Sequence, residues 1–302
     1  MNERTLRAAP VLLLTTGTCI PALGSGDSLV TSTRILAIRA DPAEAVPGTR
    51  VTFTALVASP GGTVSNADID WSFCTAPKPV TEDNVVSNAC LGSSSSLVAA
   101  GTGPTTTAAT PGDGCSVFGP DVSSAGLRPY DPDNTGGYDQ PLRAALAGAD
   151  IAIELARIHC DLANAGMAAA TAFAAAYRLN QNPELLPITA TVGGAPVALS
   201  ALPAGSRVTF EASWPAASAE TFAYFDPLSQ TIQSQRESMQ VAWYSSGGSL
   251  DTESTGRASD DVATVSDNQW DAPALPATVY LWVVLRDSRG GVDFAAYDLS
   301  VR

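Results

Sequence analysis

The fold of this chain is decided by the stretch VYLWVVLRDSRGGVDFAAY, which occupies residues 279–297. Residues 279–285 are an apolar run rich in β-branched and aromatic side chains, too short for a free-standing helix and typical of a buried strand. The polar segment 286–291 ends in two glycines, which adopt the positive φ that a tight connection needs. An alternating pattern then resumes at Val292. The stretch therefore predicts a β-hairpin that closes the protein.

An internal repeat extends this prediction to the rest of the chain. The motif Gly-x-Arg-Val-Thr-Phe-x-Ala occurs at residues 48–55 and again at residues 205–212. A tryptophan follows each copy, at Trp71 and Trp243, and each copy ends on Ala-Ala-Tyr-x-Leu, at residues 175–179 and 295–299. Two copies of one β-domain are the simplest explanation.

The repeat predicts two domains, residues 34–180 and 181–302. Alternating apolar residues predict strands in both copies, at 35–41, 51–57, 69–73, 188–192 and 239–244. The segment Asn180-Gln181-Asn182-Pro183 is the predicted junction, since its turn formers and proline disfavour a helix. Residues 250–267 are predicted to be a polar connection.

The first copy is longer than the second, and the surplus predicts an insertion at about residues 75–150. Within it, residues 92–114 are dominated by Ser, Thr, Gly, Ala and Pro, which predicts a long surface loop. Aligning the copies on Ala-Ala-Tyr-x-Leu predicts strands at 151–160 and 171–179. A short helix at 142–147 is an alternative.

The cysteines indicate export to an oxidising compartment. Besides Cys19 the chain has an even number of them, Cys74, Cys90, Cys115 and Cys160. The favoured pairing is Cys74 with Cys90, because it closes a short loop, and Cys115 with Cys160. A metal site built from the cysteines is disfavoured, because the chain has no C-x-x-C and only one histidine.

The N-terminus has the pattern of a signal peptide over residues 1–24, with two arginines before a short apolar region at 11–14. Thr16-Gly17-Thr18-Cys19 resembles a bacterial lipobox in which Cys19 is acylated, although threonines replace two of its usual residues. Cleavage before Ser25 is the alternative. The lipoprotein is favoured, since Cys19 otherwise has no role. Residues 25–33 are predicted to be a linker.

The charge balance argues against nucleic-acid binding. The chain has 30 acidic and 16 basic side chains, for a net charge of −14, and no basic stripe. An acidic surface of this kind most commonly serves solubility.

The sequence contains no recognisable catalytic constellation, and we expect no enzyme. His159 is the only histidine and lies in a predicted strand next to a cysteine that is expected to be oxidised. Gly-x-Ser-x-Gly does not occur, and nothing singles out a pair of carboxylates for glycoside hydrolysis.

Residues 131–139 are a candidate calcium loop, with oxygen ligands at alternating positions in Asp131, Asp133, Thr135 and Asp139. The position where an EF-hand-type loop carries a bidentate Glu is Leu142. An ordinary turn is therefore the favoured interpretation, and no cofactor is expected otherwise.

Two residues are candidates for ligand binding. Arg286 could bind an anion or a partner, although an Arg–Asp ion pair that fixes the hairpin is the favoured role for this segment. Trp270 lies beside a proline-containing loop and is the candidate for a sugar platform, whereas the other strand tryptophans are expected in the core.

The strand count, the mid-domain Trp71 and Trp243 and the late hairpin together resemble immunoglobulin-like β-sandwiches. The second copy, with Trp270-x-Ala-Pro273 and the closing Arg-Asp-x-Arg-Gly-Gly, resembles the immunoglobulin-like and PKD-like modules of bacterial surface proteins. With the lipobox-like start, the chain is similar to envelope lipoproteins of myxobacteria and their relatives. This resemblance implies an all-β fold of two tandem sandwiches, the first with a disulfide-stapled insertion.

We therefore expect a non-catalytic envelope lipoprotein, tethered to the outer membrane through its lipid alone, that acts as a structural or binding module for a protein or glycan. A periplasmic or secreted protein is the alternative location. The alternative functions are a carbohydrate-binding module, with or without Ca²⁺, and a secreted hydrolase with its carboxylates in the insertion.

Overall fold

The computed structural model describes residues 28–120, 134–149 and 151–302. Strands make up 49% of the described residues and helices 9%. The all-β prediction is therefore confirmed.

The first domain is a sandwich of two sheets. In the first sheet, β3 lies between β1 and β7 and also pairs with the short β4. The second sheet has the order β2-β9-β8-β5-β6. The strands are β1 (Arg34–Asp41), β2 (Glu44–Ala45), β3 (Arg50–Ser59), β4 (Gly62–Thr63), β5 (Ile69–Cys74), β6 (Leu97–Thr102), β7 (Thr105–Ala109), β8 (Gly137–Leu146) and β9 (Ile151–His159). The large side chains between the sheets are Phe53, Ile69, Trp71, Phe73 and Leu142.

The second domain repeats this arrangement. One sheet has the order β11-β10-β12-β18-β16 and the other the order β17-β15-β19-β20. The strands are β10 (Leu186–Val192), β11 (Ala195–Pro196), β12 (Arg207–Ser213), β15 (Met239–Ser245), β16 (Ser249–Leu250), β17 (Ser254–Arg257), β18 (Val265–Asp271), β19 (Ala277–Asp287) and β20 (Val292–Val301). The core contains Phe210, Trp214, Trp243 and Trp270.

Both sandwiches have the strand order of immunoglobulin-like domains. In the first, the chain leaves β1 for the opposite sheet and β2 pairs parallel with the last strand, β9. In the second, Leu202 makes the corresponding parallel bridge to Val301 of β20. The other strand pairs are antiparallel, and a tryptophan lies on β5 and on β15, the strand that carries the core tryptophan of this fold.

The structural equivalence that the repeat predicts is confirmed for its first motif and wrong for its last motif. The motif at residues 48–55 leads into β3, and its echo leads into β12, the equivalent strand. Residues 167–176, however, form a helix, α2 (Met167–Ala176), where a strand was predicted at 171–179. The first sandwich is already closed by β8 and β9, so no place in a sheet remains for this Ala-rich segment, and its helix propensity decides its structure.

The prediction of a surface loop at residues 92–114 is also wrong, because this segment contains two strands. β6 pairs with β5, and β7 pairs with β3 over residues 105–109. Residues 142–147 do not form the alternative helix, since β8 runs through Leu146. In the described residues, the segments between the strands also contain four short helices: η1 (Asn88–Cys90), α1 (Gly114–Val117), η2 (Leu199–Ala201) and η3 (Ala216–Ser218).

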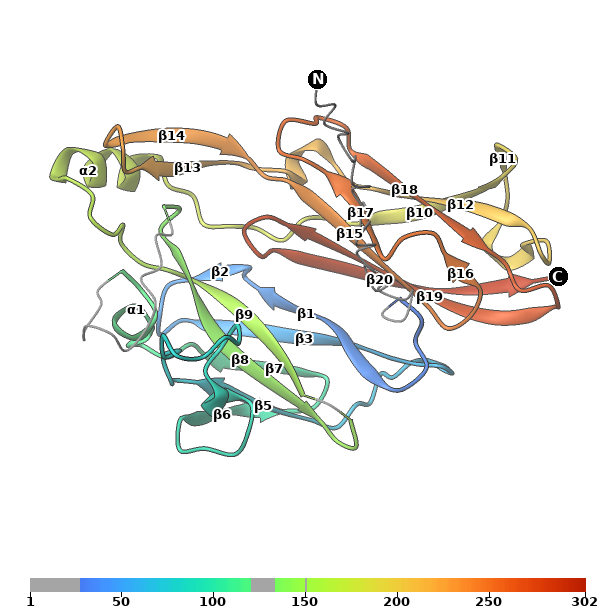
Figure 1. The fold of residues 1–302 in the computed structure, drawn as a ribbon, viewed down its shortest axis with the longest axis horizontal. Helices are drawn as coiled ribbons and strands as arrows, with labels where there is room; N and C mark the ends of the chain where they lie inside the picture. The colour runs from blue at the N-terminus through green and yellow to red at the C-terminus, as the bar shows by residue number, and fades with distance from the viewer. Residues whose placement is uncertain (1–27, 121–133, 150) are drawn as a thin grey trace, which may run out of the picture.

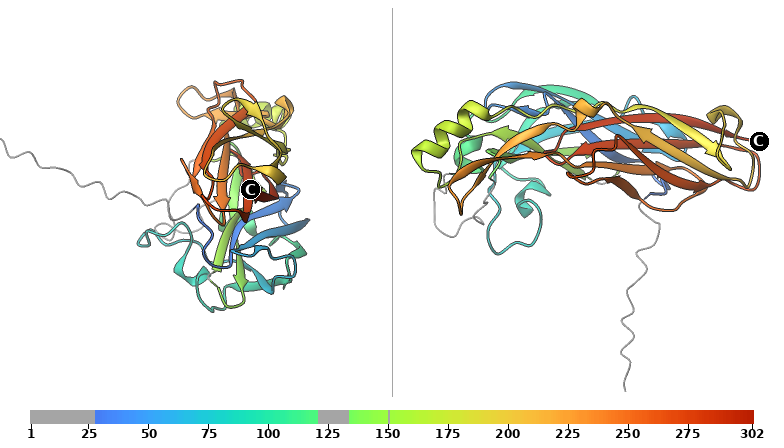
Figure 2. Two further views of the ribbon diagram at one scale, coloured as in Figure 1. Left: turned by 90° about the vertical axis from the view of Figure 1, so that its right-hand side faces the viewer. Right: turned by 90° about the horizontal axis from the view of Figure 1, so that it is seen from above.

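The two sandwiches pack side by side along a seam (Figures 1 and 2). We call the seam the apolar cluster contributed by both domains: Val30, Leu36, Ala37, Leu56, Ala58, Trp282, Val284 and Val292. The indole N–H of Trp282 donates to the Thr63 hydroxyl of the first domain at 2.9 Å. The association is therefore an apolar core with a polar edge.

Asn182 connects the two domains beside the seam. Its side-chain amide donates to the Ala40 carbonyl of β1 at 2.7 Å, and its side-chain oxygen accepts from the Val292 N–H of β20 at 2.9 Å. Both partners are backbone groups of strands at the edges of their sheets. The junction segment thus satisfies groups that would otherwise lie unpaired at a sheet edge.

Part of the predicted linker 25–33 is docked on the second domain. The Val30 N–H donates to the Ser245 carbonyl at 2.8 Å, and the Ser245 N–H donates to the Ser28 carbonyl at 2.9 Å. Val30 is buried in the seam. The burial of Val30 and these backbone hydrogen bonds therefore hold residues 28–30 on the second domain.

One end of the molecule carries α2 and a hairpin formed by β13 (Thr221–Asp226) and β14 (Thr231–Arg236) (Figures 1 and 2). The hairpin is inserted between β12 and β15 of the second domain and packs against α2. The Phe225 N–H donates to the Asn134 carbonyl of the first domain at 2.7 Å. The C-terminus lies at the opposite end. Among the described residues, no helix has the length and apolar character needed to span a bilayer.

Trp282→Ala should lower the free energy of unfolding by about 3 to 5 kcal/mol, because it removes a large side chain that is fully buried in the seam. Urea titration followed by far-UV circular dichroism measures the loss. Trp282→Phe is the matched control and should cost less, since it keeps most of the apolar volume. Equal stability of Trp282→Ala and wild type would show that the seam is open in solution.

Candidate functional site

The turn between β19 and β20 lies at the centre of a buried polar network. Arg289 donates to Glu237 at 2.6 Å, to Glu220 at 2.9 Å and to the Arg178 carbonyl at 3.0 Å. Its guanidinium also lies over the ring of Phe222. Arg289 and Glu237 are both buried, so each needs the other to offset its desolvation.

Asp287 shapes the same turn from within. Its carboxylate accepts from the backbone N–H groups of Arg289 at 2.8 Å and Gly291 at 2.9 Å, and from the Asn180 amide at 3.2 Å. The predicted Arg–Asp ion pair is therefore wrong, because backbone donors hold Asp287 and glutamates hold Arg289. Gly290 has a φ of 96°, and a Cβ at position 291 would overlap the Asp287 carboxylate.

Burial affects the ionisation of these acids. It raises the pKa of Glu237 to about 7, with Asp287 acting in the same direction and Arg289 against it. Burial also raises the pKa of Asp287, although its N–H donors oppose the rise. The charge of this buried network therefore depends on pH, since burial raises the pKa of both Glu237 and Asp287.

Glu44 forms a second buried cluster where the chain leaves the first domain. It pairs with Arg157 at 3.2 Å and accepts hydrogen bonds from the Tyr177 hydroxyl and from the Asn180 N–H, the latter at 2.8 Å. Burial and the neighbouring Glu44 raise the pKa of Tyr177. The cluster therefore anchors residues 177–183, which join the two domains and which we call the connector.

His159 belongs to this cluster. Its ring stacks on Tyr177 at 4.2 Å between centroids, and its Nδ1 lies 3.9 Å from Glu44. The adjacent Cys160 is bonded to Cys115 and is therefore no nucleophile. The surroundings of His159 thus support a structural role.

Arg286, a predicted binding residue, lies beside the seam. It is half-buried and donates to the Leu36 carbonyl at 3.4 Å. Glu154 of β9 lies within its electrostatic reach. Burial raises the pKa of Glu154 to about 7 although the Arg286 charge acts against the rise, and Asp139 adds to it.

Trp270 does not form the predicted sugar platform. It is fully buried in the second core, packs on Phe210 and donates to the Gly247 carbonyl at 3.0 Å. The segment expected to be a polar connection ends in β18, which alternates Ser266, Asn268 and Trp270 toward the interior. Because Ser266 and Asn268 are polar, the sequence pattern did not indicate that this segment is a strand or that Trp270 points into the core.

The calcium prediction falls partly outside the described residues, which do not include Asp131 and Asp133. Cys19 likewise lies outside them. Thr135 accepts a hydrogen bond from Arg157 at 2.7 Å, and Asp139 lies opposite Arg157 in the β8–β9 pair. In the part of the chain that is described, no group of three or more His, Cys, Asp or Glu side chains is placed to hold a metal. Calcium binding stays a prediction.

The structure contains the two disulfides favoured from the sequence, Cys74–Cys90 and Cys115–Cys160. The first closes residues 75–89, and we call residues 75–96, between β5 and β6, the stapled loop. Beneath it, Cys74, Val86 and Cys90 pack on Leu97 of β6 and on Ile153 and Leu155 of β9.

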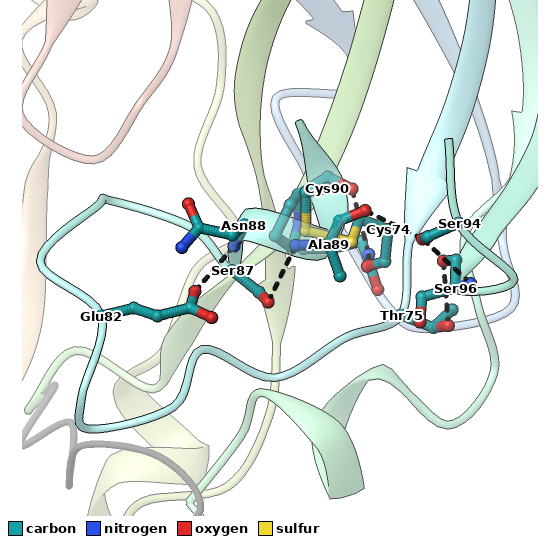
Figure 3. The surroundings of a disulfide bond; sticks show 11 residues. Cys74, Thr75, Glu82, Ser87, Asn88, Ala89, Cys90, Ser94 and Ser96 are labelled. Carbon is teal, nitrogen blue, oxygen red and sulfur yellow. Dashed lines mark hydrogen bonds between the residues drawn. A yellow bond between two sulfur atoms is a disulfide. The ribbon is translucent and has the colours of Figure 1, made fainter. Parts of the chain in front are cut away.

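Hydrogen bonds brace the stapled loop further (Figure 3). The Glu82 carboxylate accepts from the Asn88 N–H at 2.7 Å, and the Ser94 hydroxyl donates to the Ala89 carbonyl at 2.8 Å. The Thr75 hydroxyl donates to the Ser96 carbonyl at 3.1 Å. Hydrogen bonds between side chains and backbone therefore brace the loop in addition to the disulfide.

The stapled loop and the adjoining edge strand β6 expose apolar side chains. The exposed fractions are 53% for Val80, 77% for Val85, 38% for Leu91 and 50% for Val98. Four of the ten large apolar side chains that are exposed among the described residues thus belong to this segment, and exposed apolar groups on a braced loop are candidates for an interaction site. The sequence prediction passed over them, because single valines among Pro, Ser and Asn look like ordinary loop residues.

No protein-family model matches the sequence, and no curated protein is significantly similar to it. Solved structures that align with the chain include the adhesin InvE of Yersinia pseudotuberculosis, with a TM-score of 0.25, 10% identity and coverage of 92% of this chain and 61% of that one. Domains 4 and 5 of the S-layer protein SbsC align with a TM-score of 0.21 and 7% identity, covering 89% of this chain and 98% of theirs.

Escherichia coli alpha-2-macroglobulin aligns with a TM-score of 0.23 and 9% identity, covering 92% of this chain and 22% of that one. The chain thus spans less than two thirds of InvE and of the macroglobulin. Because all three TM-scores are low, the immunoglobulin-like assignment rests on the strand order of the two sandwiches.

Glu154→Gln should change the pH dependence of stability. The pKa of this carboxyl rises from 4.5 to about 7 on folding, so the folded state binds the proton more tightly and wild-type stability falls as pH rises through that window. The variant should therefore be more stable than wild type by about 1 to 3 kcal/mol at pH 8, with little difference at pH 4.

Urea titrations at both pH values measure this difference. Part of the wild-type pH dependence should persist in the variant, because Glu237 and Asp287 act in the same direction. The control is Glu184→Gln at an exposed position. A Glu154→Gln curve parallel to that of wild type would contradict the burial of this carboxyl.

Proposed function

We propose that this protein is a non-catalytic binding module of the bacterial envelope that presents the stapled loop to a protein partner. The observation that carries the proposal is the set of exposed apolar side chains on a loop braced by a disulfide and by its own hydrogen bonds. A braced loop loses little conformational entropy when it binds. Its valines can therefore contribute apolar burial at low entropic cost.

The rest of the molecule supports this role as a rigid mount. The seam and the Arg289 network join the two sandwiches, and Asn182 bridges their edge strands. A loop on such a frame keeps a constant position relative to the far end of the molecule. That property suits a scaffold or adhesion module better than an enzyme that must close around a substrate.

The proposed location is the cell envelope, with Cys19 as the lipidation site. The two disulfides indicate an oxidising, extracytoplasmic compartment. The leader pattern at residues 1–24 and the lipobox-like Thr16–Cys19 favour a lipid tether over release into the medium.

A photo-crosslinking amino acid at position 85 should capture a discrete partner in cells that make the protein. The same group at Leu275, an equally exposed position of the second domain, is the control. A Cys74→Ala/Cys90→Ala variant should lose most of the adduct at position 85, because the loop is no longer preorganised. Equal labelling from both positions would contradict the proposal.

The intact mass of protein from the membrane fraction tests the location. We expect a chain that begins at Cys19 and carries a diacylglycerol and an acyl group, with a gain of about four hydrogens on reduction of the two disulfides. A chain that begins at Ser25 without lipid would contradict the tether and leave the binding role of the loop untouched.

A further inference from the structure

The second domain has a polar hollow beside the seam, formed by residues other than those of the stapled loop, which belongs to the first domain. It has a volume of about 570 Å³ and is formed by β17, β15 and the end of β19. Pockets of this size hold small ligands in other proteins. The polar residues of its wall that share the face of Arg286 are Ser238, Gln240, Ser254 and Ser288.

Arg286 distinguishes this hollow from an ordinary surface depression. Alternation along β19 places Arg286 on the same face as Trp282 and Val284, which line the seam. Arg286, a group with five N–H donors, donates one long hydrogen bond, to the Leu36 carbonyl at 3.4 Å. Within the described part of the chain, most of its donors therefore remain available to a ligand.

Several other buried or half-buried arginines are neutralised within the protein. Arg157 and Arg289 pair with glutamates, and Arg39 pairs with Asp293 at 2.8 Å. Arg257 lies opposite the core residue Met239 in the β15–β17 pair, on the other face of the sheet from Arg286, and pairs with Asp261 at 3.3 Å. No carboxylate among the described residues lies within ion-pair distance of Arg286, although the chain carries a net charge of −14.

The one acid in the wall does not repel an anion strongly. Asp287 is buried, and its carboxylate is taken up by the backbone N–H groups of Arg289 and Gly291. Glu154 lies across the seam and interacts with Arg286 without forming an ion pair. The hollow therefore offers a guanidinium flanked by hydroxyl and amide groups.

We infer that this hollow binds a carboxylate-bearing saccharide, with Arg286 receiving the carboxylate. Arginine suits a carboxylate because its planar donors match both oxygens. Gln240 and the three serines can exchange hydrogen bonds with sugar hydroxyls. A peptide would need an apolar subsite for its side chains, and Met239, the one large apolar residue of the wall, is buried in the core.

Isothermal titration calorimetry of the full exported chain with trigalacturonate tests the site, with the neutral galactose trimer as the comparison. We expect binding of the acidic trimer only. Arg286→Gln should weaken it about tenfold or more. Arg50→Gln is the matched control and should bind like wild type, since Arg50 also makes one 3.4 Å hydrogen bond to a strand carbonyl, that of Thr107, but lies outside the hollow.

Gln240→Ala provides a second test that leaves the seam intact, because Gln240 is exposed, and it should weaken binding severalfold. The inference is overturned if wild type binds neither trimer, if it binds both equally, or if both hollow variants bind like wild type. Binding of a peptide with a free C-terminal carboxylate in preference to trigalacturonate would also overturn it. None of these results bears on crosslinking at the stapled loop.

Discussion

The ion pair between Arg289 and Glu237 is the interaction on which the arrangement of the two domains depends. Its guanidinium also contacts Glu220, which precedes the inserted hairpin, and the Arg178 carbonyl, which belongs to the connector. Three segments distant in the sequence therefore meet at one buried charge. Since a buried guanidinium is stable only with its partners in place, the closing turn, the hairpin and the connector are coupled.

The connector transmits this constraint to the first domain. Asn180 contacts Asp287 on one side and Glu44 on the other, and Asn182 spans the edge strands of both sandwiches. The seam then adds apolar burial beside these polar contacts. The two sandwiches are therefore joined by polar and apolar contacts, and the stapled loop and the polar hollow belong to different domains.

Local patterns predicted the individual strands well, and non-local pairing explains the errors. Thr171–Leu179 shares Ala-Ala-Tyr-x-Leu with β20, yet it forms part of α2 and the connector, because β8 and β9 already complete the first sandwich. Residues 97–109 are poor in large apolar side chains, yet they form β6 and β7 through backbone pairing with β5 and β3. Of the candidate site residues, Trp270 is part of the core and Arg286 lies beside a hollow that its own segment could not reveal.

The sequence by itself determined the closing hairpin, the equivalent strands β3 and β12, the tryptophans of β5 and β15 and the favoured cysteine pairing. These follow from side-chain alternation and turn chemistry, which act over a few residues, and from the short spacing of two cysteines. Only the tertiary structure decided the seam, the partners of Arg289, the direction of Trp270 and the exposure of the loop valines. Each of these depends on which surfaces meet after the strands have formed, and such contacts join residues far apart in the sequence, 52 positions for Arg289 and Glu237 and 219 positions for Trp282 and Thr63.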